Sequence, residues 1–146
     1  MDNLDVQYLR VSIEGIKMYD CNIVVIDDDN ITLELVQIIL EELISGEIYT
    51  FSDSKEGLAF VKSDKMDNIA IVICDWLMPE VSGLDILAAL RENYTLCPFL
   101  MVTANATKKL VLDSMRLGAT DFIVKPFHTN DLLDKVERLI RDADIN

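Results

Sequence analysis

From residue 22 onward the chain alternates short apolar runs with longer segments of helical spacing, and it does so five times. The runs are three to six residues long, mostly rich in β-branched side chains, with little alternation of apolar and polar residues. They span residues 23–26, 48–51, 69–74, 99–103 and 122–124. Such runs are typical of strands buried on both faces, as in a parallel sheet.

The segments between the runs have the spacing of amphipathic helices. In the first of them, Ile31, Leu35, Ile38 and Ile39 recur at i, i+4, i+7 and i+8, an apolar stripe of the kind that faces a core. The later segments cover residues 54–63, 84–93, 107–117 and 132–140. Strands that alternate with helices predict an α/β fold with a parallel sheet and right-handed crossovers.

The ends of the chain lie outside this pattern. Val6, Leu9, Ile13 and Ile16 are spaced 3, 4 and 3 apart, which matches a two-heptad helical seam for pairing or for joining an upstream partner. The interpretation we favour is a loosely docked N-terminal extension over residues 1–21, because two heptads are marginal alone. The domain itself is expected over residues 22–141, and residues 142–146 are expected to form a tail or the start of a linker.

Charge and composition narrow the possible functions. The chain has 13 Lys and Arg against 26 Asp and Glu, a net charge of -13, which disfavours direct contact with nucleic acid or an anionic membrane. It contains no apolar run as long as a membrane-spanning helix, and no signal peptide is apparent. Three cysteines without a CxxC pair fit the reducing cytoplasm.

Reactive side chains follow four of the five predicted strands. Asp27 and Asp28 follow the first strand, Asp75 the third, Thr103 ends the fourth and Lys125 follows the fifth. Because ligands bind beyond the carboxyl ends of the strands in an open parallel sheet, these side chains are expected to share one edge.

These residue types suit phosphoryl chemistry. Clustered carboxylates repel one another, and a hard divalent cation relieves that repulsion; oxygen-only ligands favour Mg²⁺. A carboxylate such as Asp75 can attack phosphorus to form an aspartyl phosphate, and Lys125 and Thr103 can stabilise the charge on the transferred oxygens. Asp29 is expected instead at the start of the first helix, where negative charge is favourable.

Four motifs together resemble the response-regulator receiver domain of two-component signalling. They are Val24-Val25-Ile26-Asp27-Asp28-Asp29, the stretch from Asp75-Trp76-Leu77-Met78-Pro79 to Leu84, Val102-Thr103-Ala104, and Gly118 through Val124-Lys125-Pro126-Phe127. The resemblance covers about residues 22–141. It implies a flavodoxin-like (βα)5 three-layer sandwich with strand order 2-1-3-4-5.

The resemblance assigns roles around the acidic residues. Asp75 would be the phosphoacceptor, phosphorylated by a histidine kinase or a phosphotransfer protein. Asp27 and Asp28 would hold Mg²⁺ together with Asp75 and the backbone carbonyl of Leu77.

The remaining site residues would act on the phosphoryl group or respond to it. Lys125, expected to precede a cis bond to Pro126, would pair with a phosphate oxygen, and Thr103 would move to hydrogen-bond the phosphoryl group. Phe122 would swing inward with Thr103, although an aromatic at a strand end can equally remain static core. Leu77 and Asn105 would tune the lifetime of the phosphorylated state.

The implied function is a cytoplasmic regulatory switch rather than an enzyme that turns over a separate substrate. Its output surface would be the fourth helix, fifth strand and fifth helix, which could contact a downstream protein, an attached output domain or a second copy of the chain. Lys108, Lys109 and Arg116 form a basic patch expected on the fourth helix, either as a solvated face or as part of this surface.

Two other functions stay open from the residues. A phosphatase of the haloacid-dehalogenase type also uses an aspartyl nucleophile and Mg²⁺, and Asp27-Asp28-Asp29 has its D-x-D spacing, with Asp27 as nucleophile. A phosphorylation-independent adaptor of the same fold is the other. A flavin electron carrier is disfavoured, since no Ser/Thr/Gly-rich phosphate loop follows the first strand.

Overall fold

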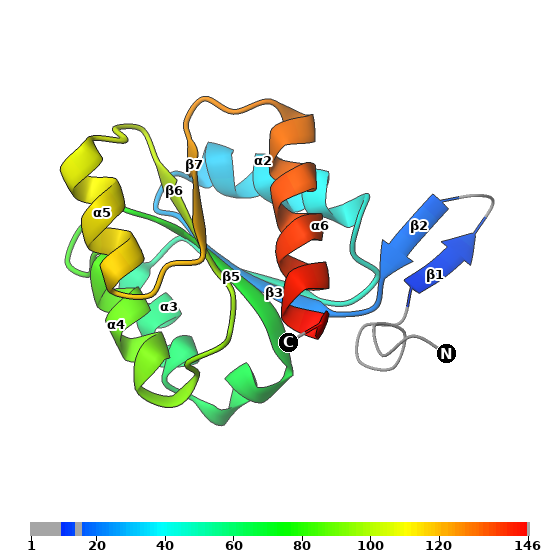
Figure 1. The fold of residues 1–146 in the computed structure, drawn as a ribbon, viewed down its shortest axis with the longest axis horizontal. Helices are drawn as coiled ribbons and strands as arrows, with labels where there is room; N and C mark the ends of the chain where they lie inside the picture. Colours follow the sequence, from blue (N-terminus) through cyan, green and yellow to red (C-terminus); the bar gives the residue numbers. More distant parts are fainter. Residues whose placement is uncertain (1–9, 14–15, 146) are drawn as a thin grey trace.

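A five-stranded parallel sheet forms the centre of the molecule (Figure 1). The structure is a computed structural model that describes residues 10–13 and 16–145. The strands of this sheet are β3 (Asn22–Ile26), β4 (Ile48–Phe51), β5 (Ile69–Asp75), β6 (Phe99–Thr103) and β7 (Asp121–Val124). Their order is β4-β3-β5-β6-β7. Counted from β3 as the first strand, this is the predicted order 2-1-3-4-5.

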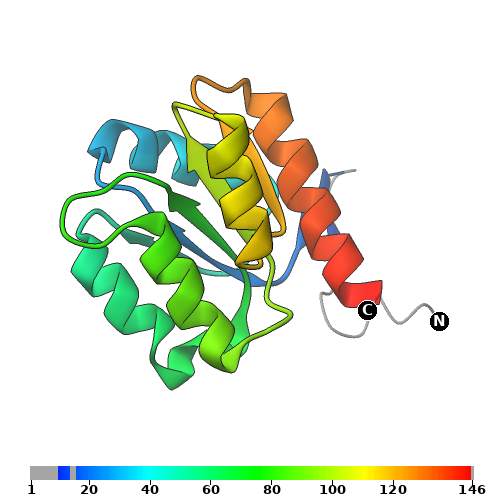
Figure 2. The same ribbon diagram turned by 60° about the vertical axis from the view of Figure 1, so that its left-hand side comes forward.

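Helices cover both faces of the sheet, which gives three layers (Figures 1 and 2). On one face lie α2 (Asn30–Glu41) and α6 (Thr129–Ile145); on the other lie α3 (Ser54–Val61), α4 (Gly83–Asn93) and α5 (Lys108–Arg116). A short 3-10 helix, η1 (Asp64–Asn68), leads into β5. The flavodoxin-like α/β fold predicted from the sequence is confirmed.

The central strand β5 is buried at every position and separates two apolar clusters. Ile71 and Ile73 face the α2 and α6 side, while Val72 and Cys74 face the other helices. Each aliphatic side chain buried in this way contributes about 1.5–3 kcal/mol relative to exposure. The strand therefore places its last residue, Asp75, firmly at the edge of the sheet.

The apolar stripe predicted for the first helix is wrong at three of its four positions. Ile31, Leu35 and Ile38 are 80%, 47% and 60% exposed. The buried residues of α2 are Leu33, Val36, Ile39 and Leu40. Both sets have helical spacing, so the sequence pattern alone does not tell which one the sheet covers.

The helical seam, the less favoured interpretation of the N-terminal extension, is contradicted where the structure describes that extension. β1 (Arg10–Ile13) and β2 (Ile16–Tyr19) pair as an antiparallel hairpin, with Ile13 opposite Ile16. Val6 and Leu9 lie outside the described residues. β-branched residues such as Val11 and Ile13 favour strands.

The end of β2 is joined to the domain rather than loosely attached. Tyr19 is 4% exposed and belongs to the apolar cluster beneath α2 and α6, as does Cys21. The Tyr19 amide donates to the carbonyl of Leu43 at 2.8 Å, and the Ser45 amide donates back to the carbonyl of Tyr19 at 3.0 Å. The buried body of the domain thus begins before residue 22.

The last helix is longer than predicted. α6 runs to Ile145 and includes residues 142–145, which the sequence assigned to a tail or linker. No Gly or Pro interrupts this stretch, so nothing in it ends the helix. None of the helices in the described residues is long and apolar enough to cross a membrane.

Gly118 provides a test of the fold at the turn between α5 and β7. Its φ of +105° is one that glycine adopts readily, and a Cβ there would lie 2.8 Å from Nε of Arg91. The same Arg91 donates two hydrogen bonds to the Gly118 carbonyl, at 3.0 and 2.7 Å. We expect Gly118→Ala to lower the free energy of unfolding by about 2 kcal/mol, measured by urea denaturation.

An Arg91→Met background separates the two causes of that loss. If the contact of the new Cβ with Arg91 is one cause, Gly118→Ala lowers the free energy of unfolding by less in this background. The part of the loss that comes from the positive φ remains. A Gly118→Ala protein as stable as wild type would contradict the conformation described for this turn.

Candidate functional site

Side chains from four strand ends meet at one edge of the sheet, as the sequence predicts. Asp27 follows β3, Asp75 ends β5, Thr103 ends β6 and Lys125 follows β7. The Lys125 ammonium lies 2.7 Å from Oδ2 of Asp27 and 3.5 Å from Oδ2 of Asp75. One cation therefore bridges two carboxylates from neighbouring strands. The bond between Lys125 and Pro126 is cis, as expected.

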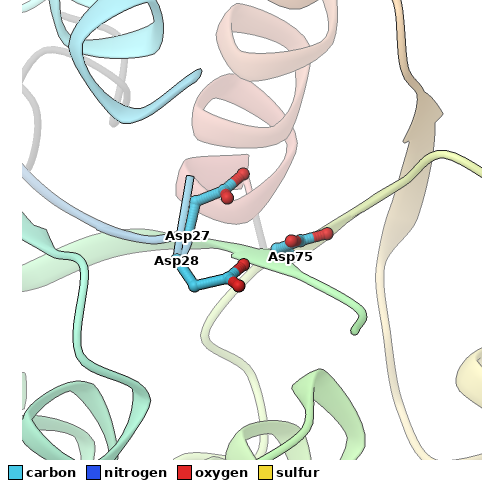
Figure 3. Close-up of side chains that lie close together, drawn as sticks. All are labelled: Asp27, Asp28 and Asp75. Atoms are coloured by element: carbon cyan, nitrogen blue, oxygen red, sulfur yellow. The ribbon is translucent and has the colours of Figure 1, made fainter. Parts of the chain in front are cut away.

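Three carboxylates, Asp27, Asp28 and Asp75, form an acidic cluster (Figure 3). One oxygen from each lies within 4.8 Å of the others. Asp27 and Asp75 are buried, whereas Asp28 is exposed. This spacing fits a single divalent cation, and a set of oxygen donors alone suits Mg²⁺ better than softer metals.

The two buried aspartates have different environments. Oδ1 of Asp27 accepts from the Asp29 amide at 2.9 Å and Oδ2 accepts from Lys125, so both oxygens are engaged. Asp29 itself caps α2 by accepting from Thr32 and Ile31, and these bonds lower its pKa, in agreement with its predicted place at the helix start. Asp75 is held only by the longer contact with Lys125 among the side chains described.

Burial and charge oppose each other at this edge. Burial, followed by the negative charge of Asp27, raises the pKa of Asp75 to about 6, while Lys125 acts in the opposite direction. Burial alone would lower the pKa of the Lys125 ammonium, but the hydrogen bond and charge of Asp27, together with Asp75, raise it above its usual value. Lys125 is thus a cation. Burial and the charge of Asp27 make the ionised form of Asp75 less favourable than that of a free carboxylate.

A cavity of about 300 Å³ opens above Asp75. Asp75, Thr103 and Lys125 line it together with Trp76, Leu77, Asn105 and Leu110. Asp27 is absent from its lining. The cavity therefore offers a nucleophilic carboxylate, a hydroxyl and a cation to a small anionic group.

The rim of the cavity contains residues of two kinds. Leu77, 72% exposed, and Asn105 were expected near the site. Trp76 and Leu110 were not assigned to it from the sequence. Trp76 directly follows Asp75, and this adjacency was the one available signal; it is also the only tryptophan, so its fluorescence reports on the site.

Thr103 and Phe122 lie on the same side of the sheet. Thr103 is 4% exposed, and its hydroxyl accepts from the Asn105 amide at 3.1 Å. Phe122 is half-buried and packs against the cluster beneath α3, α4 and α5. In the register of β6 and β7, Thr103 pairs with Val124 and Met101 with Phe122. Phe122 is therefore two residues away along its strand from the neighbour of Thr103.

Comparison with known proteins agrees with this geometry. The model of the response regulator receiver domain family matches residues 23–137. The chain is 30% identical over 124 residues to the alkaline phosphatase synthesis transcriptional regulatory protein PhoP of Bacillus subtilis, covering 84% of the chain and 50% of PhoP. It is 28% identical over 128 residues to the chemotaxis protein CheY-3 of Vibrio cholerae, covering 86% and 96%.

A solved structure shows the same architecture. The response regulator receiver domain protein from Clostridium thermocellum superposes with a TM-score of 0.78 at 28% identity, covering 86% of this chain and 98% of that one. The chain thus spans half the length of PhoP and nearly the whole length of CheY-3.

Proposed function

Since the chain belongs to the response-regulator receiver family, whose domains are regulatory switches of two-component signalling, we propose that it is switched by phosphorylation of Asp75. One observation carries the proposal. Asp75 is the member of the acidic cluster that lines the cavity, where Lys125 and Thr103 line the same space.

The geometry supports a separate role in phosphoryl transfer for each residue of the site. An oxygen of Asp75 attacks phosphorus, and a new P–O bond forms as the bond to the leaving group breaks. Lys125 pairs with the charge on the transferred oxygens and Thr103 donates its hydroxyl to one of them. Mg²⁺, held by Asp27, Asp28, Asp75 and the backbone carbonyl of Leu77, would neutralise charge on the carboxylates and the phosphoryl group. The domain catalyses only its own phosphorylation and dephosphorylation.

The alternative nucleophile, Asp27, is less suited to the reaction. Both of its oxygens already accept hydrogen bonds, from Asp29 and Lys125. It is also 3% exposed and absent from the cavity lining. A phosphatase that used Asp27 would need to break these contacts first.

The test is intact-protein mass spectrometry after incubation with acetyl phosphate, with Mg²⁺ or with EDTA. We expect a phosphoryl adduct that requires Mg²⁺, and borohydride reduction followed by peptide mapping should locate it at Asp75. An adduct at Asp27 would instead support the phosphatase. If wild type shows no adduct and no Mg²⁺-dependent release of inorganic phosphate, the phosphorylation-independent adaptor is the better description.

The exposed stripe of α2 is the proposed docking surface for the phosphodonor, a histidine kinase or phosphotransfer protein. Ile31 lies in the first turn of α2, two residues beyond Asp29, so Ile31, Leu35 and Ile38 extend away from the acidic cluster along the helix. Exposed Glu34, Glu41 and Glu42 lie on the same helix or just after it. These features fit a donor with an apolar ridge and basic flanks.

We therefore expect the double variant Ile31→Ser/Leu35→Ser to accept phosphate from a histidine-phosphorylated protein at least tenfold more slowly than wild type. Its rate with acetyl phosphate should be unchanged, because a small donor needs no docking surface. The donor is any phosphotransfer protein found to phosphorylate the wild-type chain, and transfer is followed by loss of label from the donor.

Leu96→Ser is the matched control for that variant. Leu96 is 81% exposed and lies between α4 and β6, at the opposite edge of the sheet from Asp75. It should leave both rates unchanged. Equal slowing by Leu96→Ser, or unimpaired transfer to the α2 variant, would contradict docking on this stripe.

The proposed output surface consists of α5, β7 and α6. Leu112, Met115 and Val124 are about two-fifths exposed there. Lys108, Lys109 and Arg116 add exposed positive charge on α5. We propose that this surface contacts a downstream protein or an attached output domain after phosphorylation; light scattering of the phosphorylated chain distinguishes these from a homodimer.

Two further assignments belong to the same proposal. Leu77 and Asn105, at the rim of the cavity, would set how fast water reaches the phosphorylated Asp75. The three cysteines are free, which fits the proposed location in the reducing cytoplasm.

A further inference from the structure

A contact between α6 and β7 connects a surface cation to the aromatic ring of Phe122. The ammonium of Lys135 lies 5.8 Å from the centroid of that ring. This distance is within the range of a cation–π interaction. None of the roles described above uses Lys135.

The position of Lys135 is unusual because it joins the two faces of the sheet. α6 packs on the face that it shares with α2, whereas Phe122 packs against the opposite cluster. β7 is the last strand of the described sheet, so its outer edge is open. Lys135 reaches around this edge to the ring.

Asp121 holds the Lys135 side chain in place. Its Oδ2 is 3.1 Å from Nζ of Lys135 and 3.3 Å from a guanidinium nitrogen of Arg138. Its Oδ1 accepts from the amide of Phe122 at 2.8 Å. Lys135 and Asp121 are about one-quarter exposed, whereas Arg138 is 53% exposed. The residue before the ring thus anchors the cation that lies near the ring.

We infer that Lys135 is a positioning residue that holds Phe122 at the edge of the sheet and so opposes phosphorylation of the domain. The inference rests on the proposed function, and also on the inward swing of Phe122 with Thr103 that the resemblance to receiver domains implies. An inward ring would leave the ammonium of Lys135. The cation–π contact therefore favours the state described here, and its loss favours the phosphorylated state.

The probe is beryllium trifluoride with Mg²⁺, a mimic of the phosphoryl group, and ¹⁹F NMR measures its binding directly. Lys135→Met keeps the length of the side chain and removes the charge. We expect it to tighten apparent binding by about two- to fivefold, the range that a partly exposed cation–π contact provides. Lys135→Arg keeps a cation at the position and should restore the wild-type affinity.

Arg138→Met is the matched control. It removes the other cation from the same carboxylate, one turn along the same helix, and leaves Lys135 in place. We expect its affinity to equal that of wild type. If Arg138→Met tightens binding as much as Lys135→Met does, the charge of Asp121 rather than the ring is responsible, and the inference is wrong.

A double variant makes the role of the ring explicit. In a Phe122→Leu background, the cation has no ring to hold, so Lys135→Met should no longer change the affinity. An effect that persists in this background would overturn the inference, as would an affinity of Lys135→Met equal to or weaker than wild type. Failure of the proposed function looks different, because wild type itself would then bind no beryllium trifluoride at the site.

Discussion

Asp75→Asn is expected to abolish the phosphoryl adduct completely and, in the absence of Mg²⁺, to make the fold more stable. The first result follows because an amide is not a nucleophile toward phosphorus and no other carboxylate lines the cavity. The second follows because burial and Asp27 oppose the charge of Asp75. Removing that charge leaves the pair between Asp27 and Lys125 at 2.7 Å intact.

The size of the gain follows from the pKa of Asp75. Its value is raised from 3.8 to about 6 in the folded protein. Each pKa unit corresponds to about 1.4 kcal/mol of unfolding free energy. Partial solvent access reduces the expected gain in the free energy of unfolding to about 2 kcal/mol. The melting temperature of the variant should then be higher by about 4–8 °C at neutral pH with EDTA.

The pH dependence has a definite sign. Between the unfolded pKa of 3.8 and the folded value of about 6, the folded state binds more protons than the unfolded state at Asp75. Wild type therefore loses stability as the pH rises through this window, and the variant does not. The difference in the free energy of unfolding between the two proteins should disappear below pH 4 and be largest above pH 6.

Urea denaturation at several pH values with EDTA measures this difference. Asp113→Asn is the control, because that partly exposed carboxylate pairs with two side chains of the same helix, Lys109 and Arg116. It should show no gain. Mg²⁺ should stabilise wild type more than Asp75→Asn, since the variant has lost one carboxylate of the cluster. A variant less stable than wild type at neutral pH in EDTA would contradict the environment described for Asp75.

The parts of the fold that the sequence predicts best are those that are buried on both sides. β5 is apolar along residues 69–74 and buried throughout, which is the pattern of a strand covered on both faces of a parallel sheet. The gathering of Asp27, Asp75, Thr103 and Lys125 follows from the same order, because the carboxyl ends of parallel strands meet at one edge. Their distances, in contrast, come only from the packed structure.

Other features depend on contacts that a linear pattern does not contain. In α2 the stripe from Ile31 to Ile38 and the stripe from Leu33 to Leu40 have similar spacing, and only the sheet selects the second. In the N-terminal extension, the spacing of Val6, Leu9, Ile13 and Ile16 matches a helical seam, whereas β1 and β2 pair as antiparallel strands. Ile13 lies opposite Ile16 in this pair of strands. The heptad spacing of the sequence was not sufficient to predict the pairing.

The contact of Lys135 with Phe122 could not be predicted for a related reason. Lys135 is thirteen residues beyond Phe122 and belongs to a helix on the opposite face of the sheet. The contact exists because β7 is an edge strand. Strand order was predictable from the resemblance, but the path of one flexible side chain around the edge was not.

Lys125→Met is expected to slow phosphorylation by acetyl phosphate by about 10²–10³-fold, the cost of removing one preorganised charge partner from a transferring group. A second consequence acts through Asp75. Lys125 lowers the pKa of Asp75 against burial and Asp27, so without it the carboxylate is more readily protonated and is a poorer nucleophile near neutral pH. Intact mass against time measures the rate.

The same substitution should also destabilise the fold in EDTA, by about 2 kcal/mol, because it leaves the buried Asp27 without its ion-pair partner. Mg²⁺ bound to the acidic cluster would compensate that charge and restore stability. It would not restore the rate, because the role proposed for Lys125 is to pair with the phosphoryl group itself. Recovery of stability without recovery of rate is therefore the result that identifies Lys125 as part of the reaction rather than of the fold alone.

Lys55→Met is the control for this pair of measurements. Lys55 also lies 3.0 Å from a carboxylate, that of Glu80, but both side chains are about 60% exposed. Exposed pairs contribute little, so this variant should change neither the stability nor the rate by a measurable amount. If Lys125→Met behaved in the same way, the short contact with Asp27 would have no role in either folding or phosphoryl transfer. The assignment of Lys125 to the reacting group would then be wrong.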